Sequence, residues 1–204
     1  MPGPKVVPVQ GDAQMPARVD VVVIGGGIIG VSTALELAER GVAVALCEKG
    51  GIGEEQSSRN WGWVRISWRD PREVPLMAEA IRIWQGLDQR IGRDTGYKQC
   101  GIVFASLDQK YEDKNAEWPD ILTKYQMKSR MIDGPEFSGL YPGMNHDFKS
   151  ALYTSADGRA EPQKAAPAIA EAARDKGAHI LTNCAVRGLE TSGGKISGVV
   201  TERG

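Results

Sequence analysis

Near its N-terminus the chain places a glycine-rich turn between two short apolar runs, an arrangement that few folds accommodate. Val21–Ile24 is a continuous β-branched run, which is typical of a parallel strand buried on both faces. GGGIIG follows at residues 25–30, and the apolar side chains of residues 31–41 recur at helical spacing. VAVALC at residues 42–47 is a second apolar run, which leads into Glu48. This order predicts a βαβ unit of about thirty residues.

The glycine spacing indicates what the unit binds. Gly25, Gly27 and Gly30 stand at the positions of a GxGxxG motif. In that motif the first glycine permits a tight turn, the second lets backbone N–H groups approach a pyrophosphate, and the third lets the helix pack close to the strand. Glu48 comes 18 residues after Gly30, where a carboxylate can accept the hydroxyls of an adenosine ribose. An acid at this position disfavours a 2′-phosphate, so FAD or NAD is expected rather than NADP.

Charge and composition argue against a nucleic-acid partner. The 204 residues carry a formal net charge of −1, so no overall positive field is available to hold a phosphate backbone. Hydrophobic content of 41% and charged content of 25% are ordinary for a soluble globular protein. No apolar run approaches the ~20 residues that span a bilayer, so no transmembrane segment is expected.

The cysteines and the N-terminus bear on the compartment. Cys47, Cys100 and Cys184 are scattered, odd in number and without a CxxC pair. This usage favours reduced thiols in the cytoplasm over a disulfide framework. Residues 1–18 are rich in proline and lack the apolar core of a signal peptide, so they are interpreted as a flexible leader.

A long loop separates the second strand from the next helix. In a nicotinamide-binding fold further βα repeats would follow Glu48, whereas here a segment rich in Gly, Ser and Arg extends to Glu73. Such a loop inside a compact domain is usually functional. Residues 73–91 then have the pattern of an amphipathic helix. Its expected buried side comprises Leu76, Ala80, Ile83, Trp84, Leu87 and Ile91.

Four segments together carry a resemblance to a known family. They read VVVIGGGIIGVSTALELAERGVAVALCEK, SSRNWGWVR, DPREVPLMAEAIRIW and GRAEPQKAAPAIAEAARDKGAHILTNCAVRGLE. From about residue 19 onward the chain resembles the D-amino-acid oxidase-like (DAO) family of FAD-dependent amine and amino-acid oxidoreductases, which includes sarcosine and glycine oxidases. The resemblance implies FAD as the cofactor. It also implies that the loop after Glu48 runs past the pyrophosphate and along the isoalloxazine ring.

The motif and the resemblance together assign cofactor contacts. By position, the loop would bring Ser57, Ser58 and Arg59 to the phosphates and ribityl chain, and Asn60, Trp61 and Gly62 beside the flavin. Val186 would hold the adenine edge through its backbone. The expected cofactor-binding residues are Gly25, Gly27, Ile28, Ile29, Gly30, Glu48, Lys49, Ser57, Ser58, Arg59, Asn60, Trp61, Gly62 and Val186.

The substrate side of the site is less constrained by the pattern. Trp61 and Trp63 share one face of an extended segment, which fits either contact with flavin and substrate or packing in a second domain. Arg65 and Arg69 are candidates to bind a substrate carboxylate through the planar guanidinium fork. The alternative for each arginine is a surface ion pair with Asp70 or Glu73. We assign Trp63 and Arg65 as substrate-binding.

The resemblance implies oxidation of a C–N bond in an amino acid or secondary amine. Hydride passes from the substrate α-carbon to the flavin, and the imine is hydrolysed by water, which requires orientation more than a protein base. No catalytic residue is therefore assigned. His146 and His179 have no partners at metal-ligand spacing, so they are interpreted as structural and no metal is expected. The alternatives are an FAD-dependent aromatic hydroxylase and a non-catalytic flavin-binding subunit.

The expected fold is α/β, with a Rossmann-like FAD-binding domain interleaved with a mixed α+β substrate domain. Residues 19–75 form the first part of the FAD domain, residues 76–160 the substrate domain, and residues 161–204 the return, ending in an incomplete β-meander. Measured against the family, the chain is expected to hold about half of a complete enzyme. A second chain or a missing C-terminal half is expected to complete the fold, with a small amino acid or amine as substrate.

Overall fold

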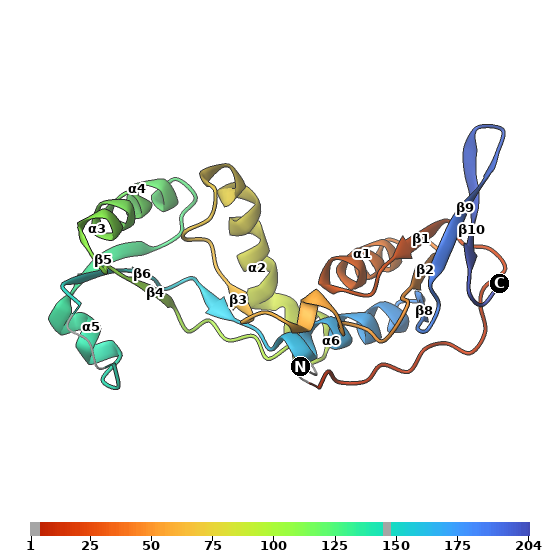
Figure 1. Ribbon diagram of the computed structural model, residues 1–204, viewed down its shortest axis with the longest axis horizontal. Coiled ribbons are helices and arrows are strands. Elements are labelled where there is room, and N and C mark those ends of the chain that lie inside the picture. Colours follow the sequence, from red (N-terminus) through yellow and green to blue (C-terminus); the bar gives the residue numbers. More distant parts are fainter. Residues whose placement is uncertain (1–4, 145–147) are drawn as a thin grey trace. The chain divides into compact units, whose positions relative to one another are not determined.

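The computed structural model describes residues 5–144 and 148–204 and divides into two compact units. Unit 1 contains the chain up to Gly62, Asp88–Gly96 and Glu161–Gly204, and unit 2 contains Trp63–Leu87 and Tyr97–Ala160. Figure 1 traces both units in the colours of the sequence. Within the described residues, no helix is long and apolar enough to cross a membrane.

Unit 1 is built on a parallel three-stranded sheet in the order β1-β2-β8. The βαβ prediction is confirmed: β1 (Val21–Ile24), α1 (Ile28–Glu39) and β2 (Val44–Cys47) follow one another, and Val21 pairs with Val44. β8 (His179–Leu181) pairs with the other edge of β2. All four residues of β2 are buried because it is the central strand, whereas the edge strand β1 is only partly covered.

Helix α6 (Pro162–Asp175) packs against α1 in unit 1. Its alanines at 165, 166, 170, 172 and 173 are buried, and such small side chains allow two helices to approach closely. The helix starts with a proline in its first turn and is followed by Gly177, which has a φ of +95°. Arg90 and Arg93 also belong to unit 1, where Arg90 pairs with Glu36 at 2.6 Å.

A two-stranded antiparallel hairpin ends the chain. β9 (Val186–Ser192) pairs with β10 (Lys195–Thr201), and the turn between them contains Gly193 and Gly194, both at positive φ. Leu189, Ile196 and Val200 on this hairpin are large apolar side chains that stay exposed. These two strands lie within residues 161–204, where the sequence predicted a β-meander.

The segment before β1 is held to the rest of unit 1 through one acidic residue, Asp12. Asp12 accepts from the Arg174 Nε at 3.1 Å and from the Ile180 backbone N–H at 3.0 Å. Its own N–H donates to the Ile180 carbonyl at 2.7 Å, and Arg203 donates to its carbonyl at 3.0 Å. The segment that was interpreted from the sequence as a flexible leader therefore makes specific contacts through Asp12.

Unit 2 is built on an antiparallel sheet in the order β4-β6-β5. These strands are β4 (Ile102–Ala105), β5 (Ser129–Asp133) and β6 (Ser150–Thr154). β3 (Trp63–Val64) and β7 (Gly158–Arg159) form a second, short antiparallel pair. The helices are α2 (Val74–Ile91, whose last turn belongs to unit 1), α3 (Gln109–Ala116), α4 (Trp118–Thr123) and α5 (Gly134–Leu140). A short 3-10 turn occupies Pro71–Glu73 in unit 2, and another occupies Gln56–Ser58 in unit 1.

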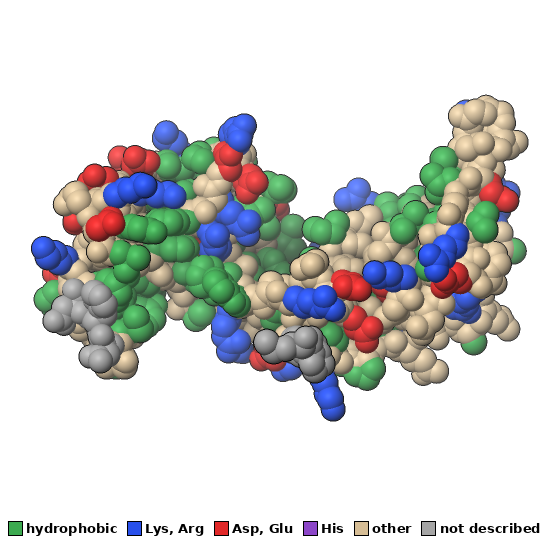
Figure 2. Space-filling model, viewed as in Figure 1, with side chains coloured by type: hydrophobic (Ala, Val, Ile, Leu, Met, Phe, Trp, Pro, Cys, Tyr) green, Lys and Arg blue, Asp and Glu red, His purple; other side chains and the backbone are tan. Residues whose placement is uncertain are grey.

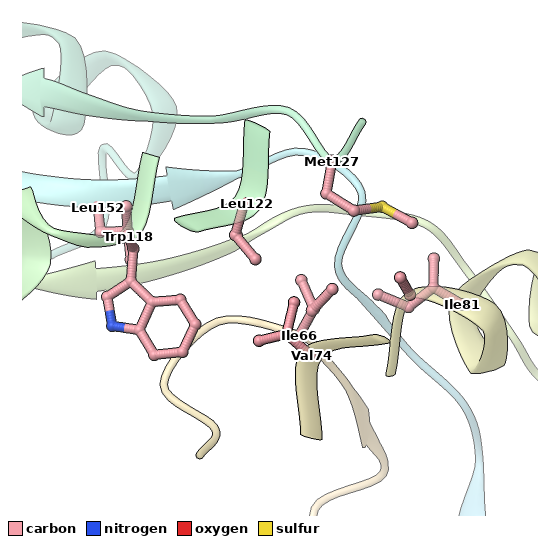
Figure 3. Close-up of a cluster of buried hydrophobic side chains, with 8 residues drawn as sticks. Ile66, Val74, Ile81, Trp118, Leu122, Met127 and Leu152 are labelled. Atoms are coloured by element: carbon pink, nitrogen blue, oxygen red, sulfur yellow. The ribbon is translucent and has the colours of Figure 1, made fainter. Parts of the chain in front are cut away.

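A hydrophobic cluster fills the space between α2, α4 and the sheet of unit 2. Figure 3 shows Ile66 beside Val74, with Leu122 and Trp118 from α4 on the opposite side. The helix predicted at residues 73–91 forms as α2, but its predicted buried side was partly wrong. Val74, Ala78, Ile81, Leu87 and Ile91 are buried, whereas Leu76 is 67% and Ile83 44% exposed. The inward side is rotated because Val74, not Leu76, is the first residue that packs on Ile66.

Candidate nucleotide and substrate site

The glycine turn between β1 and α1 has the geometry that its motif requires. Gly25 has a φ of +107°, a conformation that side chains with a Cβ rarely adopt. A Cβ on Gly30 would lie 1.9 Å from the Gly25 carbonyl oxygen, so only glycine lets α1 start this close to the turn. Gly27 is the residue at the N-terminal cap of α1 and supplies no side chain to its amides. Those amides can therefore receive an anion.

Glu48 joins the end of β2 to the glycine turn. The side chain is buried, and its Oε2 accepts from the Gly26 N–H at 2.6 Å while Oε1 accepts from the Gly50 N–H at 2.8 Å. Each carboxylate oxygen has a second lone pair, so the same group can still accept ribose hydroxyls. Gly26 and Gly50 were not selected from the sequence. A strand-terminal acid beside two glycine-rich turns was the signal that could have found them.

The loop of residues 56–62 folds back against the start of α1. The Ser57 hydroxyl accepts from the Ile28 N–H at 2.8 Å, which places this loop at the helix N-terminus. Asn60 holds the loop itself, because its amide donates to the Ser57 carbonyl at 3.0 Å and its Oδ1 accepts from the Gly62 N–H at 2.7 Å. Gly62 has a φ of +70°, which explains the need for glycine at this position.

The other predicted contacts around the turn differ in exposure. Ser58 is buried, with its carbonyl accepting from the Gln163 side chain at 3.3 Å. Lys49 and Arg59 both pair with Glu55, at 3.2 and 3.5 Å, and these cations lower the pKa of the Glu55 carboxyl. Among apolar residues here, Ile28 is half-buried, whereas Ile29 and Trp61 are about four-fifths exposed.

The chain after β8 lies against the same acid. The Cys184 N–H donates to the Glu48 carbonyl at 2.8 Å, and the Glu48 N–H donates to the Leu181 carbonyl at 2.8 Å. Val186 starts β9 two residues later and packs with Cys47 and Cys184. Burial and the neighbouring Cys184 thiol raise the pKa of Cys47 to about 11, so the Cys47 thiol stays protonated at neutral pH.

Trp63 and Arg65, the predicted substrate contacts, belong to unit 2. The Trp63 ring meets Phe104 edge-on at 5.9 Å between centroids. The Arg65 guanidinium lies 5.7 Å from the Trp63 ring centre and 5.5 Å from that of Phe104. Burial and the neighbouring Arg69 lower the pKa of Arg65, and the Asp157 carboxylate opposes them. Asp70, one of the two alternative partners considered for the arginines, binds Arg72 at 2.5 Å.

Unit 2 also contains an apolar cavity of about 330 Å³. Its lining includes Trp63, Ile102, Val103, Phe137 and Tyr141, with Arg159 among the few polar residues. Figure 2 shows hydrophobic side chains gathered over the strands of unit 2, and acidic and basic side chains intermixed on each unit. No broad basic face appears in this view, in keeping with the near-zero net charge.

The residues of unit 1 fit the adenosine and pyrophosphate parts of FAD. A side chain at Gly30 would collide with backbone, and one at Gly27 would come within 3.0 Å of the Ser57 hydroxyl. These glycines leave backbone donors accessible at the start of α1, and the Glu48 carboxylate lies beside them. In residues 5–144 and 148–204, no group of three or more His, Cys, Asp or Glu side chains could hold a metal ion.

Comparison with known proteins gives three related results. A family model described as FAD dependent oxidoreductase (DAO) matches residues 20–204. Mouse mitochondrial sarcosine dehydrogenase is 32% identical over 92% of this chain, and sarcosine oxidase subunit beta of Rhodobacter capsulatus is 28% identical over 92%. The structure of L-amino acid deaminase from Proteus myxofaciens in complex with anthranilate is 36% identical, with a TM-score of 0.94 over 99% of this chain.

The chain is shorter than all three of these proteins. It spans 21% of the mouse dehydrogenase, 47% of the Rhodobacter subunit and 46% of the Proteus deaminase chain. The relatives are named for reactions of amino acids and amines, which agrees with the oxidoreductase interpretation and not with an aromatic hydroxylase.

Proposed function

This chain belongs to the FAD-dependent oxidoreductase (DAO) family, and on that premise we propose that it is the N-terminal part of an enzyme that oxidises a C–N bond of an amino acid or secondary amine. FAD, when bound, supplies the acceptor for the hydride that leaves the substrate α-carbon, and water hydrolyses the resulting imine. The glycine turn joined to Glu48 carries this proposal, because it combines anion-binding amides with a ribose-binding acid.

In this proposal, different groups of the predicted residues bind different parts of FAD. Gly25, Gly27 and Gly30, with Ile28 and Ile29 at the start of α1, bind the pyrophosphate, and Glu48 binds the adenosine ribose. The backbone of Val186 binds the adenine edge. Lys49, Ser57, Ser58 and Arg59 lie along the phosphates and ribityl chain, and Asn60, Trp61 and Gly62 line the flavin. The hydrogen bond from the Ile28 N–H to Ser57 supports this division, because it brings the loop to the start of α1.

Trp63 and Arg65 bind the substrate in this proposal. The Arg65 fork pairs with the substrate carboxylate, and the apolar cavity beside Trp63 takes a hydrophobic side chain. Support comes from the geometry within unit 2, where the guanidinium lies on one side of the Trp63 ring system and the cavity is lined by the same tryptophan. Amino acids with apolar side chains are therefore the favoured substrates.

Further strands supplied in cis or by a second chain complete the protein. The relatives are about two to five times longer, and β1 is a partly covered sheet edge that can accept another strand. The three free cysteines favour a reducing compartment such as the cytoplasm, although the mouse relative is named as mitochondrial. No nucleic-acid partner is proposed.

The function is tested by the visible spectrum of the complete natural protein. A yellow protein should be bleached anaerobically by one or more of sarcosine, L-proline, L-leucine and L-phenylalanine, and L-aspartate should be slower than L-leucine. Bleaching by NADPH alone would instead support a hydroxylase. Bound flavin that responds to none of these compounds would support a non-catalytic subunit.

A further inference from the structure

The short loop after β3 has a backbone conformation that its sequence does not favour. Trp68 has a φ of +59°, in the left-handed region that side chains other than glycine, asparagine and aspartate rarely adopt. The ring is held on several sides: it stacks on Phe104 at 5.0 Å and on Tyr111 at 5.5 Å, and its indole N–H donates to Asn115 at 2.7 Å. Such strain persists only where neighbouring groups over-determine the conformation, and it concentrates at functional sites.

A buried carboxylate from a distant part of the chain holds the same loop. Asp157, in the turn between β6 and β7, is fully buried. Its Oδ1 accepts from the Ile66 N–H and its Oδ2 from the Ser67 hydroxyl, both at 2.8 Å. Its backbone carbonyl also accepts from the Gly101 N–H at 2.8 Å, which ties the turn to the start of β4. Figure 3 shows the Ile66 side chain inside the hydrophobic cluster, so the loop is fixed on both its polar and apolar sides.

The loop presents a guanidinium whose donors are mostly unused among the residues that the structure describes. Arg65 donates from one nitrogen to the Ser67 carbonyl, and its charge lies over two aromatic rings. Within the described part of the chain, no carboxylate lies within 4.0 Å of Arg65, although Asp157 is near enough to raise its pKa. A half-buried Arg that has five N–H donors and one protein acceptor is suited to a bidentate anion.

From these observations we infer that Asp157 is a positioning residue: it fixes the 65–68 loop so that the Arg65 fork is pre-organised for the substrate carboxylate. This inference rests on the proposed function, which makes Arg65 a substrate contact. Asp157 does not touch the substrate in this scheme. It acts through Ile66 and Ser67, the two residues that separate Arg65 from the strained Trp68.

The negative charge of Asp157 gives its removal two opposing effects on anion binding. Removing a carboxylate near Arg65 leaves that arginine with a stronger net positive field, which by electrostatics alone would tighten anion binding. Loss of loop order weakens it. Ser67→Ala separates the two effects, because it removes one of the hydrogen bonds to the loop and leaves the carboxylate in place.

The experiment uses the complete, FAD-loaded protein with benzoate as the carboxylate probe and benzamide as its neutral isostere. Binding is read from the change in the flavin spectrum. Asp157→Asn should raise the Kd of benzoate about tenfold and Ser67→Ala about threefold, with benzamide changed less than about twofold. In anaerobic reduction by the preferred amino acid of the screen, the same variants should raise the half-saturating concentration and leave the limiting rate within about threefold.

A double-mutant cycle with Arg65→Met decides whether Asp157 acts through Arg65. In that background Asp157→Asn should add less than about a twofold change in benzoate Kd, because the group it positions is already absent. Thr154→Val is the matched control: Thr154 is equally buried and its hydroxyl donates to Ser129 at 3.2 Å, away from the loop. This variant should bind benzoate like the wild type.

Three outcomes would overturn the inference: unchanged or tighter benzoate binding by Asp157→Asn together with unchanged binding by Ser67→Ala, effects that multiply fully with Arg65→Met, or an equal loss for benzamide. Where Asp157→Asn does not fold, the Ser67→Ala variant decides alone. A wild type that no amino acid bleaches and that ignores benzoate overturns the proposed function as well. A bleachable wild type with insensitive variants overturns the positioning role only.

Discussion

The two units prepare their binding groups by different physical means. In unit 1 the binding groups are mostly backbone amides at the start of α1. Gly25, Gly27 and Gly30 keep these amides accessible because they place no side chain over them. In unit 2 the groups are side chains, and Arg65 depends on a carboxylate 92 positions away in the sequence for its orientation. Backbone sites are encoded locally, whereas the side-chain site exists only after the sheet of unit 2 has formed. The first should therefore fail through steric collisions, and the second through lost hydrogen bonds.

The largest expected effect is in unit 1. Gly30→Ala places a Cβ 1.9 Å from the Gly25 carbonyl oxygen, and because the obstacle is backbone, β1 and α1 must separate. We expect a loss of more than about 4 kcal/mol of stability, together with the loss of bound flavin. Thermal unfolding and the flavin to protein absorbance ratio of the complete protein measure both. A Gly30→Ala protein that stays folded and yellow would contradict the claim that unit 1 requires glycine at residue 30.

In unit 2 the sharpest test is the pH dependence of Asp157. Burial raises the pKa of this carboxyl from 3.8 to about 6, against the hydrogen bonds from Ile66 and Ser67. The folded state therefore holds the proton more tightly than the unfolded state. The stabilisation from protonation is complete below pH 3.8 and is lost as the pH rises through about 6. At 1.36 kcal/mol per pKa unit, the difference amounts to about 3 kcal/mol.

Urea unfolding of the wild type and Asp157→Asn between pH 4 and pH 7.5 isolates this contribution, since other titrating groups cancel in the difference. On acidification the wild type should gain stability relative to the variant, mainly between pH 6 and pH 4. A difference that is flat with pH would mean that Asp157 titrates as it does in the unfolded chain. Arg65 and Tyr97 are the other ionisable groups whose charges interact with it.

Glu48 combines a side-chain group with a backbone site, because its carboxylate holds the backbone of two glycine-rich turns in place. Glu48→Ala removes the acceptor for Gly26 and Gly50 as well as a ribose contact. Flavin affinity should fall by about 1.5–3 kcal/mol, the range for hydrogen bonds to a charged group. Turnover of the protein that remains loaded should not change. Glu54→Ala is the control, since Glu54 bonds the Gly51 N–H on the same loop but is exposed.

The smallest effect concerns a glycine that has no steric role. Gly86 lies in α2, and a Cβ there meets nothing within 4 Å. Gly86→Ala should stabilise the helix by up to about 1 kcal/mol, because alanine has the higher helix propensity. A rise in Tm of a few degrees is expected by calorimetry. Destabilisation would instead show that α2 requires a glycine at this position.

The sequence predicted the elements whose pattern is local. The βαβ unit lies where the runs of apolar residues and the glycines placed it, and the last strands lie where the sequence predicted a β-meander. Helix α2 was found but its inward side was misplaced, because the choice between Leu76 and Val74 depends on where Ile66 lies in unit 2. Periodicity gives the width of an apolar stripe better than its orientation.

The interactions that the sequence could not indicate join distant segments. Nothing in the spacing of Asp157 and Ser67 suggests a hydrogen bond across 90 residues. The same holds for Asp12, a lone acid in a proline-rich segment that binds Arg174 and β8. Such contacts depend on three-dimensional proximity alone, so a single sequence carries no periodic signal for them.

The strand order β1-β2-β8 has a consequence for biosynthesis. β2 leaves the ribosome about 130 residues before β8, the strand that covers its second edge. At roughly 5–20 residues per second, that interval lasts about 7–26 s. During this time Val44 and Leu46, which are fully buried in the finished sheet, have an open edge beside them, while the sheet of unit 2 is already complete once residue 154 has emerged. The nascent chain therefore acquires its second unit before its first, and β2 is the segment that a chaperone acting during translation would protect.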